Sequence, residues 1–213
     1  MATDEDGRTA LKRRQITEAA LALFLRQGYA KTSMDQIAAD AQVSKQTVYK
    51  QYSDKETLFR ELALGIIGAS DRILQVLSAV LEPAPETTPQ LHDTLQRLTR
   101  TYLDSVMQPQ VLALRRLLIA EADQFADLAH EYYTWGPQRA IGVLADAVQD
   151  WGEKGLIDVT DASAAASRLA FLTLGPSLDR AMFHPGWIPS ARERKQQAAQ
   201  AAEAFLAAHM KRT

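Results

Sequence analysis

Hydroxyl, amide and ammonium side chains recur in one short stretch of the chain, between residues 33 and 55. The ones that could contact a ligand are Ser33, Ser44, Lys45, Gln46, Thr47, Tyr49, Lys50, Tyr52 and Lys55. Hydroxyl, amide and ammonium groups bind phosphates, and an amide also pairs with base edges. The apolar Val48 lies among them and is expected to hold this segment against a core. These residue types predict recognition of a polyanion rather than bond-breaking chemistry.

The motifs of common enzyme classes do not occur in the sequence. The chain has no cysteine, which excludes disulfides, thiolate zinc sites and a cysteine nucleophile, and which suits a reducing cytoplasm. Its histidines, at positions 92, 130, 184 and 209, have no metal-binding spacing. Neither a Gly-x-Ser-x-Gly, a phosphate-loop nor a dinucleotide-binding motif is present. We therefore expect no enzyme activity, no metal and no cofactor.

Charge is distributed unevenly along the 213 residues, although the net charge is only −2. Residues 8–60 carry ten Lys or Arg and five Asp or Glu, whereas residues 61–213 carry fourteen and eighteen. A basic segment on a mildly acidic body favours a local polyanion site. The acidic start of the chain is unlike a secretory signal, and no apolar run is long enough to span a bilayer.

Helical periodicity is present along the whole chain, and no alternating strand pattern appears. In the first third it predicts helices over about 9–27, 33–41, 44–52 and 53–80. Serines at positions 33, 44 and 53 are the expected N-caps, and Gly28 ends the first helix. Prolines 83, 85 and 89 mark the clearest loop. The fold class is therefore all-α, with a domain at 8–60 and a larger helical domain at 61–213.

The second domain is expected to contain helices separated by proline and glycine. Pro109 divides two of them, Gly136-Pro137 restarts a helix that Gly155 closes, and Asp161 caps the next, which a Gly175-Pro176 kink interrupts. Ser190 caps the last helix. The helices at about 161–183 and 190–210 carry Ala and Leu stripes suited to packing against a second copy of the chain.

A helix-turn-helix positions one short helix in the DNA major groove, with an apolar underside and donors at its N-terminus. Residues 33–55 provide these features. Each donor also has a structural alternative. Ser33 and Ser44 serve first as caps, Tyr49 and Lys55 contact phosphates or remain ordinary core and surface residues, and Gln46 reads a base or only solvates the helix start. The basic residues Arg8, Lys12, Arg13 and Arg14 form either a disordered arm or a solvated helix face.

The run from Ile16 to Leu62 resembles the N-terminal domain of the tetracycline-repressor (TetR) family. The matching elements include Gly28-Tyr29, Thr32-Ser33-Met34-Asp35-Gln36-Ile37-Ala38, Val43-Ser44 and Thr47-Val48-Tyr49-Lys50 through Phe59. The resemblance implies a two-domain helical homodimer whose N-terminal domain binds a palindromic operator. By position, the donors of residues 33–55 match family DNA contacts. Gln42 stands where the family usually has the glycine of the turn, so a left-handed conformation there would be mildly strained. Gln46 stands where the family often has a small residue or glycine. Because glutamine can form two hydrogen bonds with adenine, Gln46 is the best candidate for reading a base.

The resemblance also implies a ligand cavity in the larger domain, whose segment from Leu114 through Pro137 resembles an AefR-like subgroup. That subgroup responds to hydrophobic compounds and controls efflux or stress genes. The candidate ligand-binding residues are Tyr102, Met107, Glu121, Phe125, Tyr132, Tyr133, Trp135, Arg139, Phe171 and Asp179, with His130 as a further polar handle. For any single aromatic residue, ordinary core packing is the alternative.

These features predict a cytoplasmic, dimeric repressor with double-stranded DNA and a small effector as partners and no membrane association. Ligand binding is expected to move the middle helices, and the long fourth helix is expected to carry that motion to the DNA-binding domain. An activator of the same fold remains an alternative. A helical adaptor for protein or membrane is a further one, which a basic amphipathic first helix would support.

Overall fold

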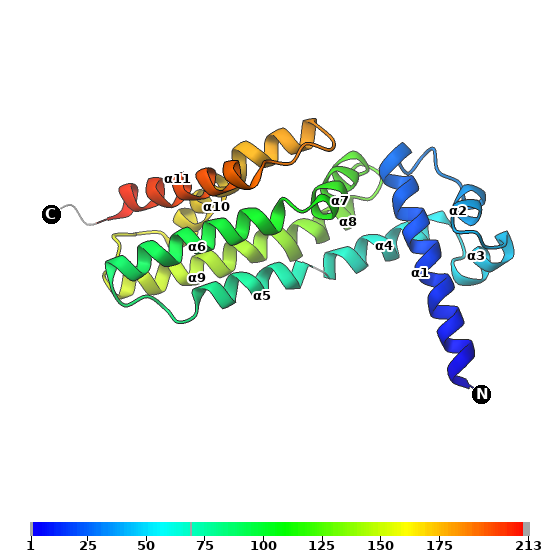
Figure 1. Cartoon of the computed structure of the whole chain (residues 1–213), viewed down its shortest axis with the longest axis horizontal. Coiled ribbons are helices and arrows are strands. Elements are labelled where there is room, and N and C mark those ends of the chain that lie inside the picture. The colour runs from blue at the N-terminus through cyan, green and yellow to red at the C-terminus, as the bar shows by residue number, and fades with distance from the viewer. Residues whose placement is uncertain (1, 69, 211–213) are drawn as a thin grey trace. The chain divides into compact units, whose positions relative to one another are not determined.

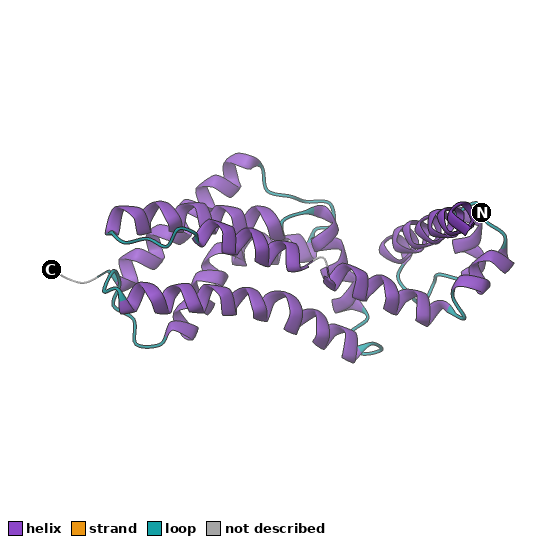
Figure 2. Ribbon diagram, turned by 90° about the horizontal axis from the view of Figure 1, so that it is seen from below, coloured by secondary structure: helices purple, strands orange, loops and turns teal. Residues whose placement is uncertain are grey.

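Helices make up all the secondary structure that the computed structural model describes (Figures 1 and 2). The described backbone comprises residues 2–68 and 70–210, and the described side-chain environments comprise residues 7–65 and 71–210. Within this part of the chain there is no strand, as the sequence predicts. No helix in it has the length and apolar character needed to cross a membrane.

The chain divides into two compact units. Unit 1 contains residues 1–68 together with 113–131, and unit 2 contains residues 69–112 and 132–213. The first unit is therefore larger than the segment 8–60 expected from sequence, because a stretch from the middle of the chain packs into it. The chain passes between the units three times, after residues 68, 112 and 131.

Unit 1 is built from α1 (Ala2–Gln27), α2 (Met34–Asp40), α3 (Lys45–Gln51) and α4 (Lys55–Gly68). It also includes residues 113–131, which cover most of α7 (Pro109–Ala120) and the start of α8 (Ala126–Tyr133). The helical spacing of Ile16, Ala20 and Leu23 places them on one buried face of α1. Val48 is fully buried and fixes the underside of α3.

The first helix is longer than its sequence pattern predicts. It begins at Ala2 instead of Thr9, and the basic residues Arg8, Lys12, Arg13 and Arg14 lie on it with exposed side chains. The alternative of a disordered arm is therefore wrong, and the solvated helix face is right.

Helix caps follow the predicted serines with one exception. Ser33 and Gln36 form a reciprocal capping box, and the hydroxyl of Ser44 accepts a hydrogen bond from the Thr47 amide. At α4, however, the cap is Asp54, whose Oδ1 accepts from the Thr57 amide at 2.7 Å. A carboxylate one residue later replaces Ser53, because a charged acceptor binds an N-terminal amide more strongly than a hydroxyl does. The predicted helix over 53–80 corresponds to α4 and α5 (Ser70–Leu81), with Ala69 outside the described residues.

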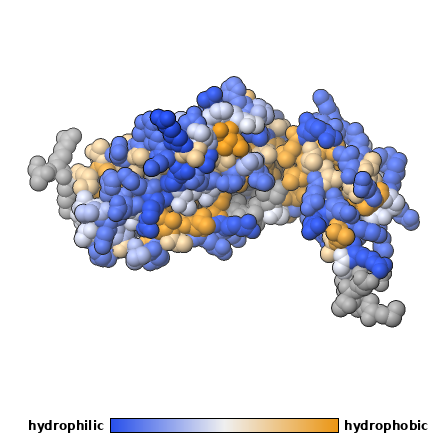
Figure 3. Space-filling view, in the orientation of Figure 1, coloured by the Kyte–Doolittle hydropathy of each residue, from blue (hydrophilic) through white to orange (hydrophobic). Residues whose placement is uncertain are grey.

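Unit 2 contains α5, α6 (Thr88–Val106), α9 (Arg139–Glu153), α10 (Ala162–Phe183) and α11 (Ala191–His209). Helix α6 packs against α5, α10 and α11, and α9 packs against α5 and α10. Their apolar faces meet in one core that includes Leu95, Trp151 and Phe205. The visible face of unit 2 in Figure 3 is largely hydrophilic with separate apolar patches.

A π-helical turn, η1 (Thr134–Gln138), joins α8 to α9 without ending the helical backbone. The prediction that Gly136-Pro137 begins a new helix is therefore wrong. Pro137 has no amide hydrogen to donate to the preceding turn, and a local π-helical turn accommodates such a defect inside a continuous helix. Pro176 likewise lies inside α10, and Gly155, with a φ of 69°, follows the end of α9.

Candidate nucleic-acid interface

The short helix α3 presents a compact set of exposed hydrogen-bond donors. Lys45, Gln46, Tyr49 and Lys50 are exposed, and the Tyr49 side chain has an exposed fraction of 51%. Val48, between them in sequence, is fully buried. The buried Val48 therefore anchors α3 on one side and leaves its polar side open to solvent. A helix that enters the major groove of DNA needs such an open polar side.

The turn that leads into α3 contains the single non-glycine residue of the described chain with a positive φ. Gln42 has a φ of 55°, in the left-handed region. Its amide donates to the Ala39 carbonyl at 3.1 Å, and the Val43 amide donates to the Ala38 carbonyl at 3.0 Å. Gln42 therefore adopts the left-handed conformation that is mildly strained for a residue other than glycine. The two hydrogen bonds close the turn between α2 and α3.

The N-terminus of α3 is organised by Ser44 and Lys45. The hydroxyls of Ser44 and Thr47 are 2.8 Å apart, so both belong to the cap of this helix. The Lys45 ammonium lies 2.6 Å from Asp35 Oδ2 of α2. Sequence reasoning overlooked Asp35, although its position ten residues before Lys45 follows directly from the spacing of two helices and a short turn.

Lys55 is engaged by its own chain, which corrects the expected phosphate contact. Its ammonium donates to the carbonyls of Tyr29 at 2.8 Å and Thr32 at 2.9 Å, and it lies 4.1 Å from the centre of the Tyr29 ring. Burial lowers the pKa of this lysine. Lys55 therefore holds the turn between α1 and α2 in place. Its position in the first turn of α4 does not indicate this partner, because Tyr29 and Thr32 lie more than twenty residues away in the sequence.

Tyr52 is a core residue, which corrects its inclusion among the DNA contacts. Its exposed fraction is 1%, its hydroxyl donates to Glu61 Oε1 at 3.0 Å, and the Arg13 guanidinium lies 5.6 Å from its ring centre. Arg13 also donates to both carboxylate oxygens of Glu61. Burial raises the pKa of Tyr52, and the hydrogen bonds from Arg13 lower the pKa of Glu61. This network ties α1 and α4 to the end of α3.

Residues from the middle of the chain complete the other side of unit 1. Glu121 Oε1 accepts a hydrogen bond from the Tyr29 amide at 3.1 Å. Phe125 packs on Tyr29 and Phe59 with ring centres 4.8 and 4.6 Å apart, and Phe24 joins the same aromatic cluster. Asp127 pairs with Arg60 of α4, and His130 of the same segment is exposed. Glu121 and Phe125 are thus structural parts of unit 1, which corrects their assignment as ligand-binding residues.

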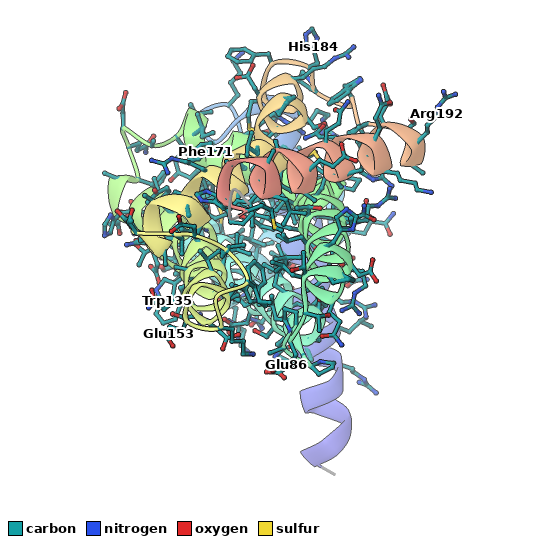
Figure 4. All side chains as sticks on the ribbon, turned by 90° about the vertical axis from the view of Figure 1, so that its left-hand side faces the viewer. Glu86, Trp135, Glu153, Phe171, His184 and Arg192 are labelled. Carbon is teal, nitrogen blue, oxygen red and sulfur yellow. The ribbon has the colours of Figure 1, made fainter. Side chains whose placement is uncertain are left out.

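The remaining ligand-binding candidates divide between the core and the surface of the chain. Tyr102 and Met107 are buried in the core of unit 2, and Tyr132 is partly buried. The residues that the structure places at the surface instead are Tyr133, Trp135, Arg139, Phe171 and Asp179. Arg139 pairs with Asp71 at 2.7 Å and lies over the Trp135 ring, and Figure 4 shows Trp135 and Phe171 at the outside of the ribbon. The helical spacing of apolar residues could not show which aromatic residues are buried by neighbouring helices and which are exposed to solvent.

Thr134 has a property that the sequence did not indicate. Its hydroxyl oxygen is buried in the first position of η1 and has no hydrogen-bond partner in the described part of the chain. Within the same part, no group of His, Cys, Asp or Glu is arranged to hold a metal ion.

Both the N-terminal and the C-terminal parts of the chain match known protein families. Residues 16–62 match the family described as bacterial regulatory proteins, tetR family, and residues 93–211 match the AefR-like transcriptional repressor C-terminal domain. The chain is 31% identical over 160 residues to the HTH-type transcriptional repressor SCO4008 of Streptomyces coelicolor, covering 74% of this chain and 72% of that protein.

Solved structures agree over nearly the whole chain. A protein from Mesorhizobium loti assigned to the TetR-family transcriptional regulators is 37% identical, with a TM-score of 0.79, covering 96% of this chain and 99% of that one. The flavonoid-responsive regulator FrrA is 27% identical, with a TM-score of 0.67, covering 95% and 98%.

Proposed function

The chain belongs to the TetR family of bacterial regulatory proteins, and on this premise we propose that it is a repressor released from a palindromic operator by a small hydrophobic effector. Members of this family are DNA-binding transcriptional regulators, not enzymes. The observation that carries the proposal is the open polar side of α3 above the buried Val48. Helix α3 is the recognition helix.

Within that helix, Gln46 reads a base and its neighbours position the protein on the backbone. A glutamine amide pairs with adenine through two hydrogen bonds in the major groove. Phosphate contacts come from Lys45, Tyr49 and Lys50, together with the hydroxyls of Ser33, Ser44 and Thr47 where their caps leave them free. Tyr52 and Lys55 support this surface from within unit 1.

Two copies of the chain pair through α10 and α11. The apolar residues Phe171, Leu172 and Phe183 of α10 are exposed, with exposed fractions of 71%, 43% and 76%. Covering large apolar side chains favours association. A two-fold dimer presents two recognition helices to the two halves of a palindrome.

The effector binds in unit 2 and lowers operator affinity from there. One structural relative is named as flavonoid-responsive, which supports a small-molecule effector, and the C-terminal match is to an AefR-like repressor domain, which supports repression. The proposed control of efflux or stress genes rests on the sequence resemblance to the AefR-like subgroup. Because the chain connects the two units after residues 68, 112 and 131, a change in unit 2 has three covalent routes to unit 1. The coupling is limited by the effector's preference for one state.

In vitro selection of bound duplexes from a random pool tests the proposal. We expect the selected sequences to share a palindrome. The logarithm of the affinity of the protein for it should fall linearly with the logarithm of the salt concentration. Selection with the variant Gln46→Ala should give sequences whose base preference is altered at one symmetric pair of positions. Loss of the glutamine–adenine pair should reduce the discrimination against a wrong base at each position by about 1–3 kcal/mol. Gln75→Ala, at an exposed residue of α5, is a matched control that should leave the selected sequence unchanged. Recovery of no common sequence would refute operator recognition, and an unchanged preference for Gln46→Ala would refute base reading by that side chain.

A further inference from the structure

An ion pair joins the first turn of the recognition helix to the preceding helix. Lys45 is the first residue of α3, and Asp35 is the second residue of α2. Their Nζ and Oδ2 atoms are 2.6 Å apart, while the two side chains keep exposed fractions of 67% and 54%. A positive charge in the first turn of a helix is opposed by the helix dipole. The Asp35 carboxylate therefore stabilises a charge that α3 itself disfavours, and it does so where DNA can reach both groups.

From this pairing we infer that Asp35 is a specificity-determining residue. It holds Lys45 in an internal ion pair that a phosphate contact has to break, and so makes that charge less available to the phosphates of non-specific DNA. The inference rests on the proposed DNA binding by α3. Phosphates are the same at every sequence, so each available lysine strengthens binding to all duplexes. Gln46, the neighbour of Lys45, contributes only where the correct base is present.

The two kinds of complex respond differently to the ion pair. A non-specific complex is held together by charge. Because the protein can adjust to whichever phosphates lie nearby, every unpaired lysine or arginine at the interface strengthens that complex. In the operator complex, base contacts fix the position of α3, which limits what the Lys45 side chain can gain. Asp35 therefore weakens the non-specific complex more than the operator complex.

The test compares Asp35→Asn with a matched control in the same helix. Asp40 is also in α2 and also forms an exposed pair, with Arg26 at 3.5 Å. Asp40→Asn changes the net charge of the chain by the same amount without touching Lys45. Both full-length variants are titrated with the selected operator and with a random-sequence duplex of equal length, over a series of salt concentrations.

We expect Asp35→Asn to bind the random duplex about two- to fivefold more tightly, the range that one exposed ion pair supports. The slope of log affinity against log salt for that duplex should become steeper by up to about 0.9, the value of one added phosphate contact. Operator affinity should change less, so the ratio of the two affinities falls. Asp40→Asn should keep the wild-type ratio.

Equal effects of Asp35→Asn and Asp40→Asn on the ratio would overturn the inference. A parallel loss of affinity for both duplexes would also overturn it, since Asp35 would then only brace α2 against α3. A second comparison uses Lys45→Ala with and without Asp35→Asn. In the absence of Lys45, removing the Asp35 carboxylate should not increase affinity for the random duplex further. An increase that persisted without Lys45 would overturn the inference, because it would be a general effect of charge. If the wild type bound no duplex, the proposed function would fail, an outcome distinct from all of these.

Discussion

Gln42 illustrates how one residue sets the geometry of the helix-turn-helix. Its φ of 55° is costly for a residue with a Cβ, whereas glycine adopts it freely. The turn keeps this conformation because α2 and α3 are both anchored in the core, through Ile37 and Val48. The strain is thus a local cost that the packing of two helices offsets.

Replacing Gln42 with Gly should stabilise the protein. Removing the left-handed penalty gains about 1–2 kcal/mol, and the added freedom of glycine in the unfolded chain returns about 0.5–1 kcal/mol of it. The net effect should be a higher urea midpoint with an unchanged slope. Gly28→Ala is the opposite control. Gly28 has a φ of 83°, and an added Cβ would have ordinary contact with Glu121 at 3.7 Å, so this variant should lose stability through the backbone alone. A lower midpoint for Gln42→Gly would contradict the argument.

At the scale of elements, unit 1 is held together by side chains that connect helices distant in sequence. Arg13 of α1, Tyr52 at the end of α3 and Glu61 of α4 form one hydrogen-bonded network. Lys55 and Glu121 bind the Tyr29 carbonyl and amide, respectively. The turn between α1 and α2 is therefore fixed by α4 and by the segment 113–131, and the exposed face of α3 depends on both.

The Glu61 network predicts a pH dependence of stability. The pKa of Glu61 is lower in the folded chain than in the unfolded chain, where it is about 4.3. The unfolded state consequently binds the proton more readily, so this contribution is present above that pH and disappears as pH falls through the folded pKa. Glu61→Gln should lower the free energy of unfolding by less than about 1 kcal/mol at pH 7, because the carboxylate is partly exposed.

Urea unfolding of wild type and Glu61→Gln between pH 7 and pH 3 measures this difference, which should shrink towards acid. Glu18→Gln is a suitable control, since Glu18 and Arg14 form a largely exposed pair at 3.5 Å. That variant should change the unfolding free energy far less. A Glu61→Gln difference that grew towards acid would have the wrong sign for this network.

At the scale of the whole molecule, exposed apolar side chains on α10 favour assembly of two chains. Phe183 is the most exposed of the large apolar residues, and Phe171 and Leu172 lie on the same helix. Such side chains are costly to leave in water when a second copy can cover them. In the proposed dimer, recognition of two half-sites depends on a surface in unit 2, far along the sequence from the residues proposed to read DNA.

Phe183→Asp should therefore shift the protein from dimer to monomer and weaken operator binding by an order of magnitude or more, since about 1.4 kcal/mol already gives tenfold. Sedimentation and operator titration at the same protein concentration measure both effects. Tyr133→Ser removes an exposed aromatic residue, 56% exposed, from α8 rather than α10. It should leave both quantities unchanged. A monomer that kept full operator affinity would refute the two-fold arrangement.

The sequence by itself was sufficient for the fold class, most helix boundaries and the position of the helix-turn-helix domain. Helical periodicity, caps such as Ser33, Ser44 and Ser190, and the left-handed turn at Gln42 are local properties, and the structure confirms each of them. Propensity, capping and turn geometry act over a few residues, so a linear sequence contains them. The resemblance over residues 16–62 is the same kind of information, and the family match agrees with it.

Only the tertiary structure decided which side chains face outwards and which are occupied by other parts of the chain. Lys55 and Tyr52 are engaged within unit 1, Glu121 and Phe125 join it from 60 or more positions away, and Lys45 is paired with Asp35. Trp135 and Phe171 lie at the surface although both are aromatic. These outcomes depend on contacts between distant segments, which helical periodicity does not encode. The donors between Ser33 and Lys55 thus divide into those that α3 presents to solvent and those that hold α3 in place.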